Sequence, residues 1–523
     1  EWYDAIASEY GLMLFTAVIA AVWMVWRTYR TDDHRAEYLL VLVWAAFITA
    51  AAFTQVRFNY YLAVPVAVLN AYLVKQVLSL ANVTNRESLT DIEGYQVLAL
   101  VFVVLLIVPV LVTPASVGSS GYPAIDNTNT AMQAGQTAPG AVTKWDGSLD
   151  WMANSTPAEG DYGDANNEDQ LDYYGTFDQS NSDYDYPDGA YGVMSWWDYG
   201  HWITVEGERI PNANPFQEGA RTAANYLLAP NESEANEVID TLGGPSEETR
   251  YVMVDWKMAS VYDNAGGKFF APATFKENVS RSDYYESVYR QGQNGLQTAF
   301  NLRSQDYYES QMARLYLYHG SRMEAQPIVV DWRARQYETS NGEVASLKMN
   351  EQGPNATLVR RFQTMEQARS FVANDSTAQI GGISQFPSES VEALNHYRVV
   401  NQSQASGANN ARWAQQLRAE MQLLQQGGAI RSPSQMFQTQ PSWVKTFERV
   451  PGATVTGTGP ANTTVTAAVR MSPVGQNGSF TYSQQAETGP NGEFTMTLPY
   501  SSTGYENWGP ENGYTNVSVR ATG

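Results

Sequence analysis

The sequence predicts a multi-span α-helical membrane segment, followed by a mixed α/β extracytoplasmic domain and a C-terminal β-sandwich. Three observations support this prediction. Four apolar runs fill the first 113 residues, β-branched runs alternate with amphipathic ones between about 191 and 400, and short alternating runs separated by turn residues follow position 450. At 523 residues the chain is long enough for three or four domains.

The four apolar runs cover residues 10–26, 38–54, 60–80 and 95–112. Each is close to the ~20 residues that a helix needs to cross a bilayer. Core helices of a soluble protein rarely follow one another in this way with only short polar joints. A cleaved signal peptide does not explain them, because the runs repeat and lack a cleavage site. We therefore predict four transmembrane helices within residues 1–113.

The charges in the first polar joint predict the orientation. The joint reads "RTYRTDDHRAE" and carries Arg27, Arg30 and Arg35, which the positive-inside rule places in the cytoplasm. Everything after about residue 113 then lies outside, in a multi-pass protein of the cell membrane. Nine N-x-[ST] triplets downstream of residue 113 fit such an exported region.

The composition is strongly acidic. The chain has 32 Lys and Arg against 54 Asp and Glu, a formal charge of -22, of which residues 1–113 contribute only -3. This balance argues against a nucleic-acid surface, which needs clustered basic residues. Only seven of the basic residues are lysine, and an acid-rich, lysine-poor surface suits concentrated salt, so we expect a halophilic source. The absence of cysteine excludes disulfides, thiolate metal sites and a cysteine nucleophile.

The exported region divides by local pattern. Residues 114–190 form an acidic, loop-rich connection, and 191–400 a mixed α/β domain with strands at "YVMVDW" and "PIVVDW" and helices at "EGARTAANYLLA" and "SEANEVIDTLG". Residues 401–440 form a helical connector, "ARWAQQLRAEMQLLQQGG", that glycine ends. Residues 441–523 alternate, as in "TVTAAVRM" and "GSFTYSQ", which predicts a β-sandwich-like domain.

One segment concentrates unusual residues. "SWWDYGHW", residues 195–202, holds three of the chain's 14 tryptophans, with a tyrosine, an aspartate and a glycine. An indole N–H is only a donor and an ionised carboxylate only an acceptor, so Trp196, Trp197 and Asp198 can together bind a hydroxyl group. The same cluster can also stack on a sugar ring or fill a core. The chemistry of the residues leaves these three interpretations open.

Arg57, in the second joint "TQVRFNYYLAVP", lies at the predicted outer membrane interface. One interpretation is an interfacial anchor, with the arginine reaching the headgroups beside Tyr60 and Tyr61. The other is a cation that binds the phosphate of a lipid substrate through the paired donors of its guanidinium.

The pentapeptide "WWDYG" resembles the signature of the catalytic subunit of N-oligosaccharyltransferases. The whole chain resembles the C-terminal portion of the archaeal AglB family, covering its last four helices and soluble domain, and the acidic bias is similar to that of a haloarchaeal member. The resemblance implies transfer of an oligosaccharide from a dolichol phosphate carrier to the amide nitrogen of Asn in an N-x-[ST] sequon. The implied partners are the membrane, the lipid-linked oligosaccharide and acceptor polypeptides, in a single-subunit enzyme.

The resemblance also implies roles for individual residues. Trp196, Trp197 and Asp198 would hold the acceptor Ser or Thr hydroxyl, with Tyr199 and Gly200 shaping the turn. A second family motif packs against the threonine methyl. Its segment here, "VDWKMASVY", departs from the family spacing, because the lysine comes two residues after the aspartate and methionine takes the third place. The residues implied there are Asp255, Lys257, Met258 and Val261, and Arg57 is implied to contact the phosphate of the lipid carrier.

The resemblance implies a divalent metal, Mn or Mg, that acts as a Lewis acid and binds the phosphate leaving group. The family holds this ion with carboxylates on external loops that precede the portion resembled here. We therefore assign neither metal ligands nor catalytic residues in this chain, and predict that the isolated chain recognises the acceptor but does not catalyse transfer.

Two other functional classes fit parts of the sequence. One is a non-catalytic, membrane-anchored envelope or carbohydrate-binding protein. The other is a different polyprenyl-phosphate-dependent glycosyltransferase, which would bind sugar and ignore peptide. Of the three classes, only an oligosaccharyltransferase should prefer an Asn-x-Thr peptide to its Asn-x-Ala counterpart.

Overall fold

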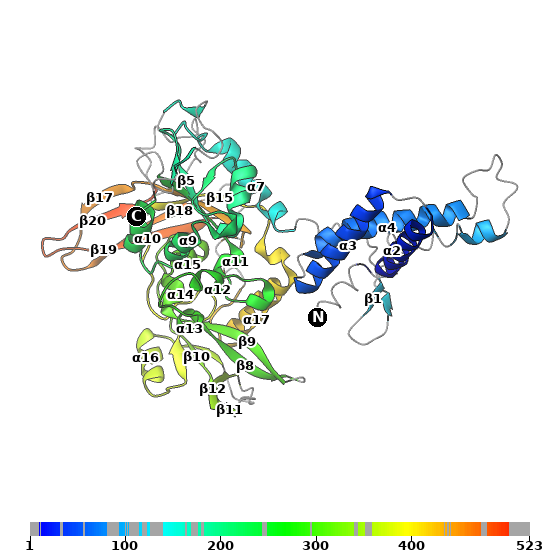
Figure 1. Ribbon diagram of the computed structural model, residues 1–523. Helices are drawn as coiled ribbons and strands as arrows, with labels where there is room; N and C mark the ends of the chain where they lie inside the picture. The colour runs from blue at the N-terminus through cyan, green and yellow to red at the C-terminus, as the bar shows by residue number, and fades with distance from the viewer. Residues whose placement is uncertain are drawn as a thin grey trace. The chain divides into compact units, whose positions relative to one another are not determined.

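The computed structural model describes most of the chain between residues 10 and 500 (Figure 1). It divides into two compact units, Glu1–Gly140 and Ala141–Gly523. The described residues are 10, 12–31, 35–55, 58–80, 94–99, 101, 103, 115–117, 123–125, 140–162, 165–168, 176–178, 183–242, 248–292, 295–338, 344–350, 358–432, 435–436, 439, 441–471 and 479–500.

Three long helices make up most of the described part of the first unit. They are α2 (Leu12–Arg30), α3 (Ala36–Thr54) and α4 (Asn59–Leu80), and two short strands, β1 (Ala115–Val117) and β2 (Pro123–Ile125), pair further along. α4 packs against both α2 and α3. A buried polar contact joins α2 to α4, since the Thr16 hydroxyl donates to Asn70 Oδ1 (2.6 Å) and Asn70 Nδ2 donates to the Met13 carbonyl (2.9 Å).

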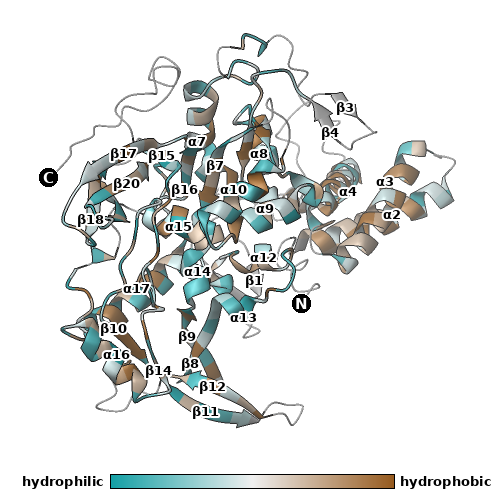
Figure 2. Cartoon of the chain, turned by 90° about the vertical axis from the view of Figure 1, so that its left-hand side faces the viewer, coloured by the Kyte–Doolittle hydropathy of each residue, from teal (hydrophilic) through white to brown (hydrophobic). Residues whose placement is uncertain are grey.

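Within the described residues, α3 and α4 are long and apolar enough to cross a membrane. Large apolar side chains of α3, among them Leu39, Leu40 and Phe47, are exposed, and Figure 2 shows the hydrophobic colour of these helices. The fourth predicted run lies largely outside the described residues, as does Arg57. The arrangement of four spans therefore stays a prediction.

A five-stranded mixed sheet forms the centre of the second unit, in the order β15-β16-β7-β5-β6. β7 runs parallel to β5, and β5 runs parallel to β6, whereas β16 is antiparallel to both β7 and β15. Every residue of β7 is buried, as expected for the "YVMVDW" run. The five strands are β5 (Gly192–Met194), β6 (Ile210–Pro211), β7 (Thr249–Asp255), β15 (Tyr397–Gln402) and β16 (Val444–Arg449).

Helices cover this sheet. α7 contacts β15 and β16 and buries Trp145, Leu149 and Met152, although it lies in the segment predicted to be loop-rich, while α15 contacts β7. The α-helices are α7 (Val142–Ser155), α8 (Gly200–Val205), α9 (Ala220–Leu227), α10 (Glu232–Asp240), α11 (Trp256–Ala259), α12 (Phe270–Ala273), α13 (Arg281–Tyr284), α14 (Gln305–Glu309), α15 (Gln311–Tyr318), α16 (Met365–Ala373) and α17 (Ala411–Gln426). Short 3₁₀ helices are η5 (Trp197–Tyr199), η6 (Pro215–Gln217), η7 (Asp263–Ala265) and η8 (Gly407–Asn409).

Two smaller sheets and a hairpin complete the domain. The orders are β11-β12-β8-β9 and β13-β10-β14, and β3 pairs with β4. Their strands are β3 (Thr176–Asp178), β4 (Asp183–Asp185), β8 (Tyr285–Gly292), β9 (Gly295–Arg303), β10 (Ile328–Asp331), β11 (Arg333–Glu338), β12 (Val344–Met349), β13 (Val359–Arg361) and β14 (Ala378–Ile380).

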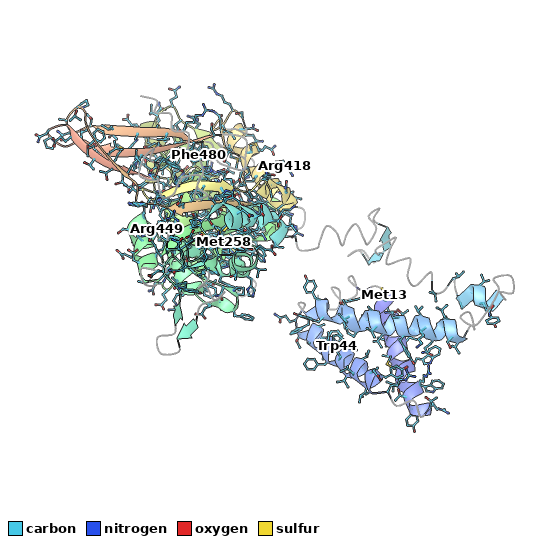
Figure 3. All side chains as sticks on the ribbon, turned by 90° about the horizontal axis from the view of Figure 1, so that it is seen from above. Met13, Trp44, Met258, Arg418, Arg449 and Phe480 are labelled. Atoms are coloured by element: carbon cyan, nitrogen blue, oxygen red, sulfur yellow. The ribbon has the colours of Figure 1, made fainter. Side chains whose placement is uncertain are left out.

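The C-terminal strands form two antiparallel pairs, β17–β20 and β18–β19. They are β17 (Ala453–Thr458), β18 (Thr464–Met471), β19 (Phe480–Glu487) and β20 (Glu493–Leu498). Phe480 and Tyr482 of β19 are buried in the main core cluster (Figure 3), so these strands pack on the α/β core. The predicted β-strand character of the tail is confirmed, and the sandwich itself stays a prediction.

Candidate functional site

The pentapeptide begins at the carboxyl end of the parallel strand β5. The hydroxyl of Ser195, directly after the strand, donates to the Met253 carbonyl of β7 (2.8 Å), and both residues are buried. The chain then turns through η5, where the Tyr199 N–H donates to the Trp196 carbonyl (3.0 Å), and continues into α8. Because β7 is the parallel neighbour of β5, the segment that follows β7 meets the pentapeptide at the same edge of the sheet.

Gly200 occupies a position that no larger residue fits. A Cβ there would lie 2.4 Å from the Ala213 carbonyl oxygen and 2.5 Å from Asn214 Cα. Its backbone angles, φ -54° and ψ -44°, are ordinary helical values. The glycine is therefore required by the close approach of the loop before η6, and not by an unusual backbone conformation.

The side chains of the pentapeptide face two environments. Trp196 and Tyr199 are each only 2% exposed, and the Tyr199 ring lies 4.4 Å from that of Trp145. Asp198 keeps 27% of its side chain exposed, and Trp197 is half-buried. The indole Nε1 of Trp197 is shielded from solvent and has no hydrogen-bond partner among the described residues. A shielded, unpaired donor beside a partly exposed carboxylate is suited to a ligand that offers both an acceptor and a donor.

Asp255 links the second segment to the pentapeptide. As the N-cap of α11, its Oδ1 accepts from the Met258 N–H (3.0 Å), and its Oδ2 accepts from the Tyr199 hydroxyl (2.9 Å). Burial raises the pKa of Asp255, an effect opposed by the charge of Lys257 and by these hydrogen bonds. Burial and the Asp255 charge raise the pKa of Tyr199 well above its ordinary value, so the phenol stays protonated and remains a donor.

The other residues predicted in this segment lie in different places. Met258 is 1% exposed and Val261 fully buried, so neither side chain faces solvent; Figure 3 shows Met258 within the α/β body. Lys257 is half-buried, with Nζ 5.7 Å from the centre of the Trp443 ring. Burial lowers the pKa of Lys257, and the charge of Asp255 opposes this shift.

Lys268 is a site residue that the sequence analysis missed. Its Nζ forms an ion pair with Asp198 Oδ2 and lies 5.5 Å from the centre of the Tyr199 ring. Its backbone N–H donates to the Lys257 carbonyl (2.6 Å). The two glycines directly before it were the available signal, because Gly266 has a φ of +89° and a Cβ on Gly267 would lie 2.4 Å from the Ser260 carbonyl oxygen.

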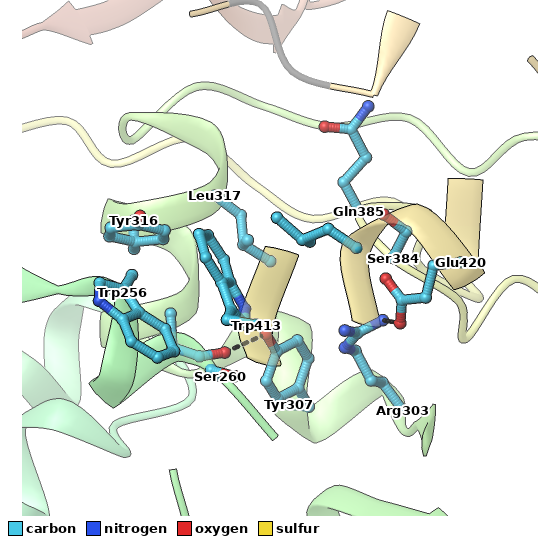
Figure 4. Close-up of a pocket in the computed structure, with 12 residues that line it drawn as sticks. Trp256, Ser260, Arg303, Tyr307, Tyr316, Leu317, Ser384, Gln385, Trp413 and Glu420 are labelled. Carbon is cyan, nitrogen blue, oxygen red and sulfur yellow. Dashed lines mark hydrogen bonds and ion pairs between the residues drawn. The ribbon is translucent and has the colours of Figure 1, made fainter. Parts of the chain in front are cut away.

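A small cavity lies behind α11, with a volume of about 30 Å³ (Figure 4). On one side Trp256 stacks on Trp413 of α17 with ring centres 4.7 Å apart, and on the other Arg303 pairs with Glu420 of α17 at 3.0 Å. The lining residues are Trp256, Ala259, Ser260, Arg303, Tyr307, Tyr316, Leu317, Ser384, Gln385, Trp413, Leu417 and Glu420.

Hydrogen bonds around this cavity fix the segment that follows α11. The Tyr307 hydroxyl donates to the Ala259 carbonyl (2.6 Å), and Asn301 Nδ2 donates to the Val261 carbonyl (2.5 Å). The Tyr262 hydroxyl donates to Glu420 Oε1. α17, predicted only as a connector, therefore supports the second segment from behind.

Comparisons with known proteins identify the family. The model described as the AglB core domain matches residues 142–259, which contain both the pentapeptide and Asp255, and the archaeal glycosylation protein B long peripheral domain matches residues 452–523. The chain is 52% identical over 526 residues to the dolichyl-monophosphooligosaccharide–protein glycotransferase AglB of Haloferax volcanii, covering 98% of this chain and 47% of that protein. The chain belongs to the AglB family. The resemblance predicted from the pentapeptide is confirmed.

More distant AglB relatives show similar coverage. The dolichyl-phosphooligosaccharide–protein glycotransferase 3 of Archaeoglobus fulgidus is 25% identical over 522 residues, which are 94% of this chain and 52% of the relative. The chain thus spans about half the length of the curated AglB relatives it matches.

Solved structures show the same fold. An Archaeoglobus fulgidus oligosaccharyltransferase in complex with zinc and sulfate matches with a TM-score of 0.50 at 22% identity, covering 95% of this chain and 55% of that one. A structure of an oligosaccharyltransferase from that organism, tethered to an acceptor peptide containing the NVT sequon, matches with a TM-score of 0.52 at 20% identity, covering 99% and 56%. These matches support the AglB fold.

The AglB family implies a divalent metal, and we tested whether the residues present fit one. Among the residues that the structure describes, no group of three or more His, Asp or Glu side chains is placed to hold a metal ion. Asp198 and Asp255 are instead engaged by Lys268 and by Tyr199 with Met258. The described site thus does not fit a metal centre, and the chemistry of its residues is that of hydrogen-bonded recognition.

Proposed function

We propose that this chain recognises the acceptor sequon in N-linked glycosylation, the transfer of an oligosaccharide from a dolichol phosphate carrier to Asn in N-x-[ST]. The observation that carries the proposal is the pairing of an exposed acceptor with an unpaired donor in the pentapeptide. Asp198 Oδ1 has no hydrogen-bond partner among the described residues, and Trp197 Nε1 has none either. A Ser or Thr hydroxyl would donate to the first and accept from the second.

The similar proteins support this reading of the site. The relatives in Haloferax volcanii and Archaeoglobus fulgidus are named as glycotransferases that use dolichyl-linked oligosaccharides. Solved neighbours of the same fold hold an acceptor peptide with the NVT sequon, and an inhibitory peptide with a dolichol phosphate. For this chain the acceptor polypeptide and the lipid-linked oligosaccharide are therefore the proposed partners, and no further subunit is proposed.

Individual residues take stated roles in the proposal. Trp197 and Asp198 touch the hydroxyl, while Trp196, Tyr199 and Gly200 build the turn that presents them. Asp255 fixes Tyr199, and Lys257, Met258 and Val261 are proposed to face the threonine methyl. Since Met258 and Val261 are buried in this structure, that contact requires the segment after α11 to move.

The membrane and metal parts of the proposal rest on the sequence and the family. We propose four spans in the cell membrane, an extracytoplasmic second unit, and contact of Arg57 with the carrier phosphate. Mn or Mg is proposed to be held by residues outside this chain, so the chain by itself would bind acceptor without transferring glycan.

A peptide-binding comparison tests the proposed function. A labelled Asn-x-Thr peptide and its Asn-x-Ala counterpart are titrated against the full-length protein in detergent and high salt, with Asp198→Asn as the variant. We expect a roughly 10- to 100-fold preference for the Thr peptide, which is the range for a hydrogen bond to a charged group, and its loss in the variant. Equal binding of both peptides by the wild-type protein would overturn the proposal in favour of the carbohydrate-binding alternatives.

A further inference from the structure

Two lysines lie close to the pentapeptide in a chain that has only seven. The family spacing directs attention to Lys257, yet the ammonium group that pairs with Asp198 belongs to Lys268. Lys257 points its ammonium group towards the Trp443 ring instead. The lysine that acts on the pentapeptide carboxylate is therefore one that lies 13 positions after Asp255, outside the second motif.

The backbone around Lys268 is anchored to the second segment on both sides. The Lys268 N–H donates to the Lys257 carbonyl, and the Phe269 N–H donates to the Ser260 carbonyl (3.3 Å). The Phe269 ring is fully buried. Gly267 permits this approach because its missing Cβ would collide with Ser260. Only the side chain of Lys268 leaves this anchored loop, and it reaches across to Asp198.

The ion pair itself contributes little to the stability of the fold. The Lys268 and Asp198 side chains are 32% and 27% exposed, and pairs screened by solvent are weak. Its effect on the carboxylate is geometric. An ionised carboxylate has two equivalent oxygens, and Lys268 occupies Oδ2. Oδ1 then remains as the oxygen available to a ligand, on a carboxylate whose orientation is set by the second segment.

We propose that Lys268 is a positioning residue for hydroxyl recognition, which holds Asp198 so that Oδ1 is presented to the Ser or Thr hydroxyl of the acceptor. The proposal rests on the proposed function, because it assigns the orientation of the carboxylate that grips the sequon. It also makes the hydroxyl preference depend on the loop 266–268, so that the pentapeptide and the second segment act as one unit.

The test compares Lys268→Gln and Lys268→Arg in the full-length protein. The measured quantity is the ratio of the dissociation constants for the Asn-x-Ala and Asn-x-Thr peptides. We expect Lys268→Gln to lower this ratio about tenfold with little change for the Ala peptide, and Lys268→Arg to retain most of it, because Arg also pairs with a carboxylate. Lys348→Gln is the matched control, since Lys348 pairs with Glu286 on another sheet with 29% of its side chain exposed, and it should leave the ratio unchanged.

Two results would overturn the assignment of Lys268. An unchanged ratio in Lys268→Gln would show that Asp198 needs no partner, and an equal loss for both peptides would show a structural role alone. A double variant with Asp198→Asn separates the routes, because an effect that acts through the carboxylate disappears once the carboxylate is gone. If the wild-type protein shows no preference for the Thr peptide, the proposed function fails first, so the two failures are distinguishable.

Discussion

The Tyr199 hydroxyl donates a 2.9 Å hydrogen bond to Asp255, and this contact joins the turns that follow two neighbouring parallel strands. Both groups are buried, so the carboxylate depends on this donor and on the Met258 N–H in place of water. The contact holds the pentapeptide at a fixed distance from the second segment.

Tyr199→Phe should therefore lower the free energy of unfolding by about 1.5 to 3 kcal/mol, because it leaves a charged, buried acceptor with one donor fewer. Chemical denaturation measures this. Tyr318→Phe is the matched control, since that buried tyrosine donates to the neutral Gln385 carbonyl (3.0 Å), and its loss should cost about 0.5 to 1.5 kcal/mol. A smaller effect at Tyr199 than at Tyr318 would contradict the role given to Asp255.

Gly200→Ala should destabilise the protein, although helical backbone angles normally favour alanine. The collision with Ala213 and Asn214 involves backbone atoms that cannot rotate away, so we expect a loss of about 1 to 3 kcal/mol. Gly147→Ala in the exposed face of α7 is the opposite case, because nothing lies within 4 Å of its Cβ position, and it should gain roughly 0.5 to 1 kcal/mol. Thermal unfolding of both variants gives the two signs directly.

Lys445 should make stability rise with pH in the alkaline range. Its Nζ is buried against the Tyr316 carbonyl (2.5 Å) and His319 Nε2 (2.9 Å), and burial lowers the pKa of Lys445 to about 7. Burial and the Lys445 charge lower the pKa of His319 well below its ordinary value, so the imidazole is already neutral in this range. Between about pH 7 and 10.5 the unfolded chain binds one more proton than the native state at Lys445, so this residue adds up to about 1.4 kcal/mol of stability per pH unit.

Lys445→Met removes this titrating group. Denaturation curves of the wild type and Lys445→Met between about pH 8 and 9.5 should converge as the pH rises, with a difference in slope of about 1 kcal/mol per pH unit. This range lies below the ionisation of the buried tyrosines, whose raised pKa values would act with the opposite sign. Parallel curves would mean that Lys445 is charged in the native protein.

The Arg303–Glu420 pair should behave as a buried ion pair whose halves depend on each other. Glu420→Ala leaves Arg303 buried without its carboxylate and also removes the acceptor of the Tyr262 hydroxyl, so we expect a loss of about 3 to 5 kcal/mol. The apolar double variant Arg303→Met with Glu420→Leu should recover much of this loss, because neither charge then remains buried. Urea denaturation of the three proteins decides, and equal losses in the single and double variants would contradict the interpretation.

Much of the fold follows from local pattern. The apolar run "YVMVDW" became the buried strand β7, and the helix predicted from "ARWAQQLRAEMQLLQQGG" ends as α17 at Gln426, directly before Gly427. These elements were predictable because hydrophobic periodicity and glycine stops act over a few residues. The pentapeptide was found for the same reason, since its residues are contiguous.

The rest of the site depends on contacts between distant parts of the chain. Lys268 lies 70 positions from Asp198, and Glu420 lies 158 positions from Tyr262, so no local pattern could pair them. Exposure was equally inaccessible. Asn401 begins one of the nine N-x-[ST] triplets but is only 4% exposed in β15, and Met258 is an apolar residue of the site that faces the interior.

The register of β16 has a practical consequence for engineering the protein. Val444, at its start, pairs with Asp255, whereas Arg449, at its end, leads within a few residues into the C-terminal strands. Five residues of extended chain place these two ends roughly 17 Å apart. A fluorescent label or affinity tag in the turn between β17 and β18 would thus be attached through the strand end remote from Asp255, which makes that turn a suitable place to report on peptide binding without obstructing it.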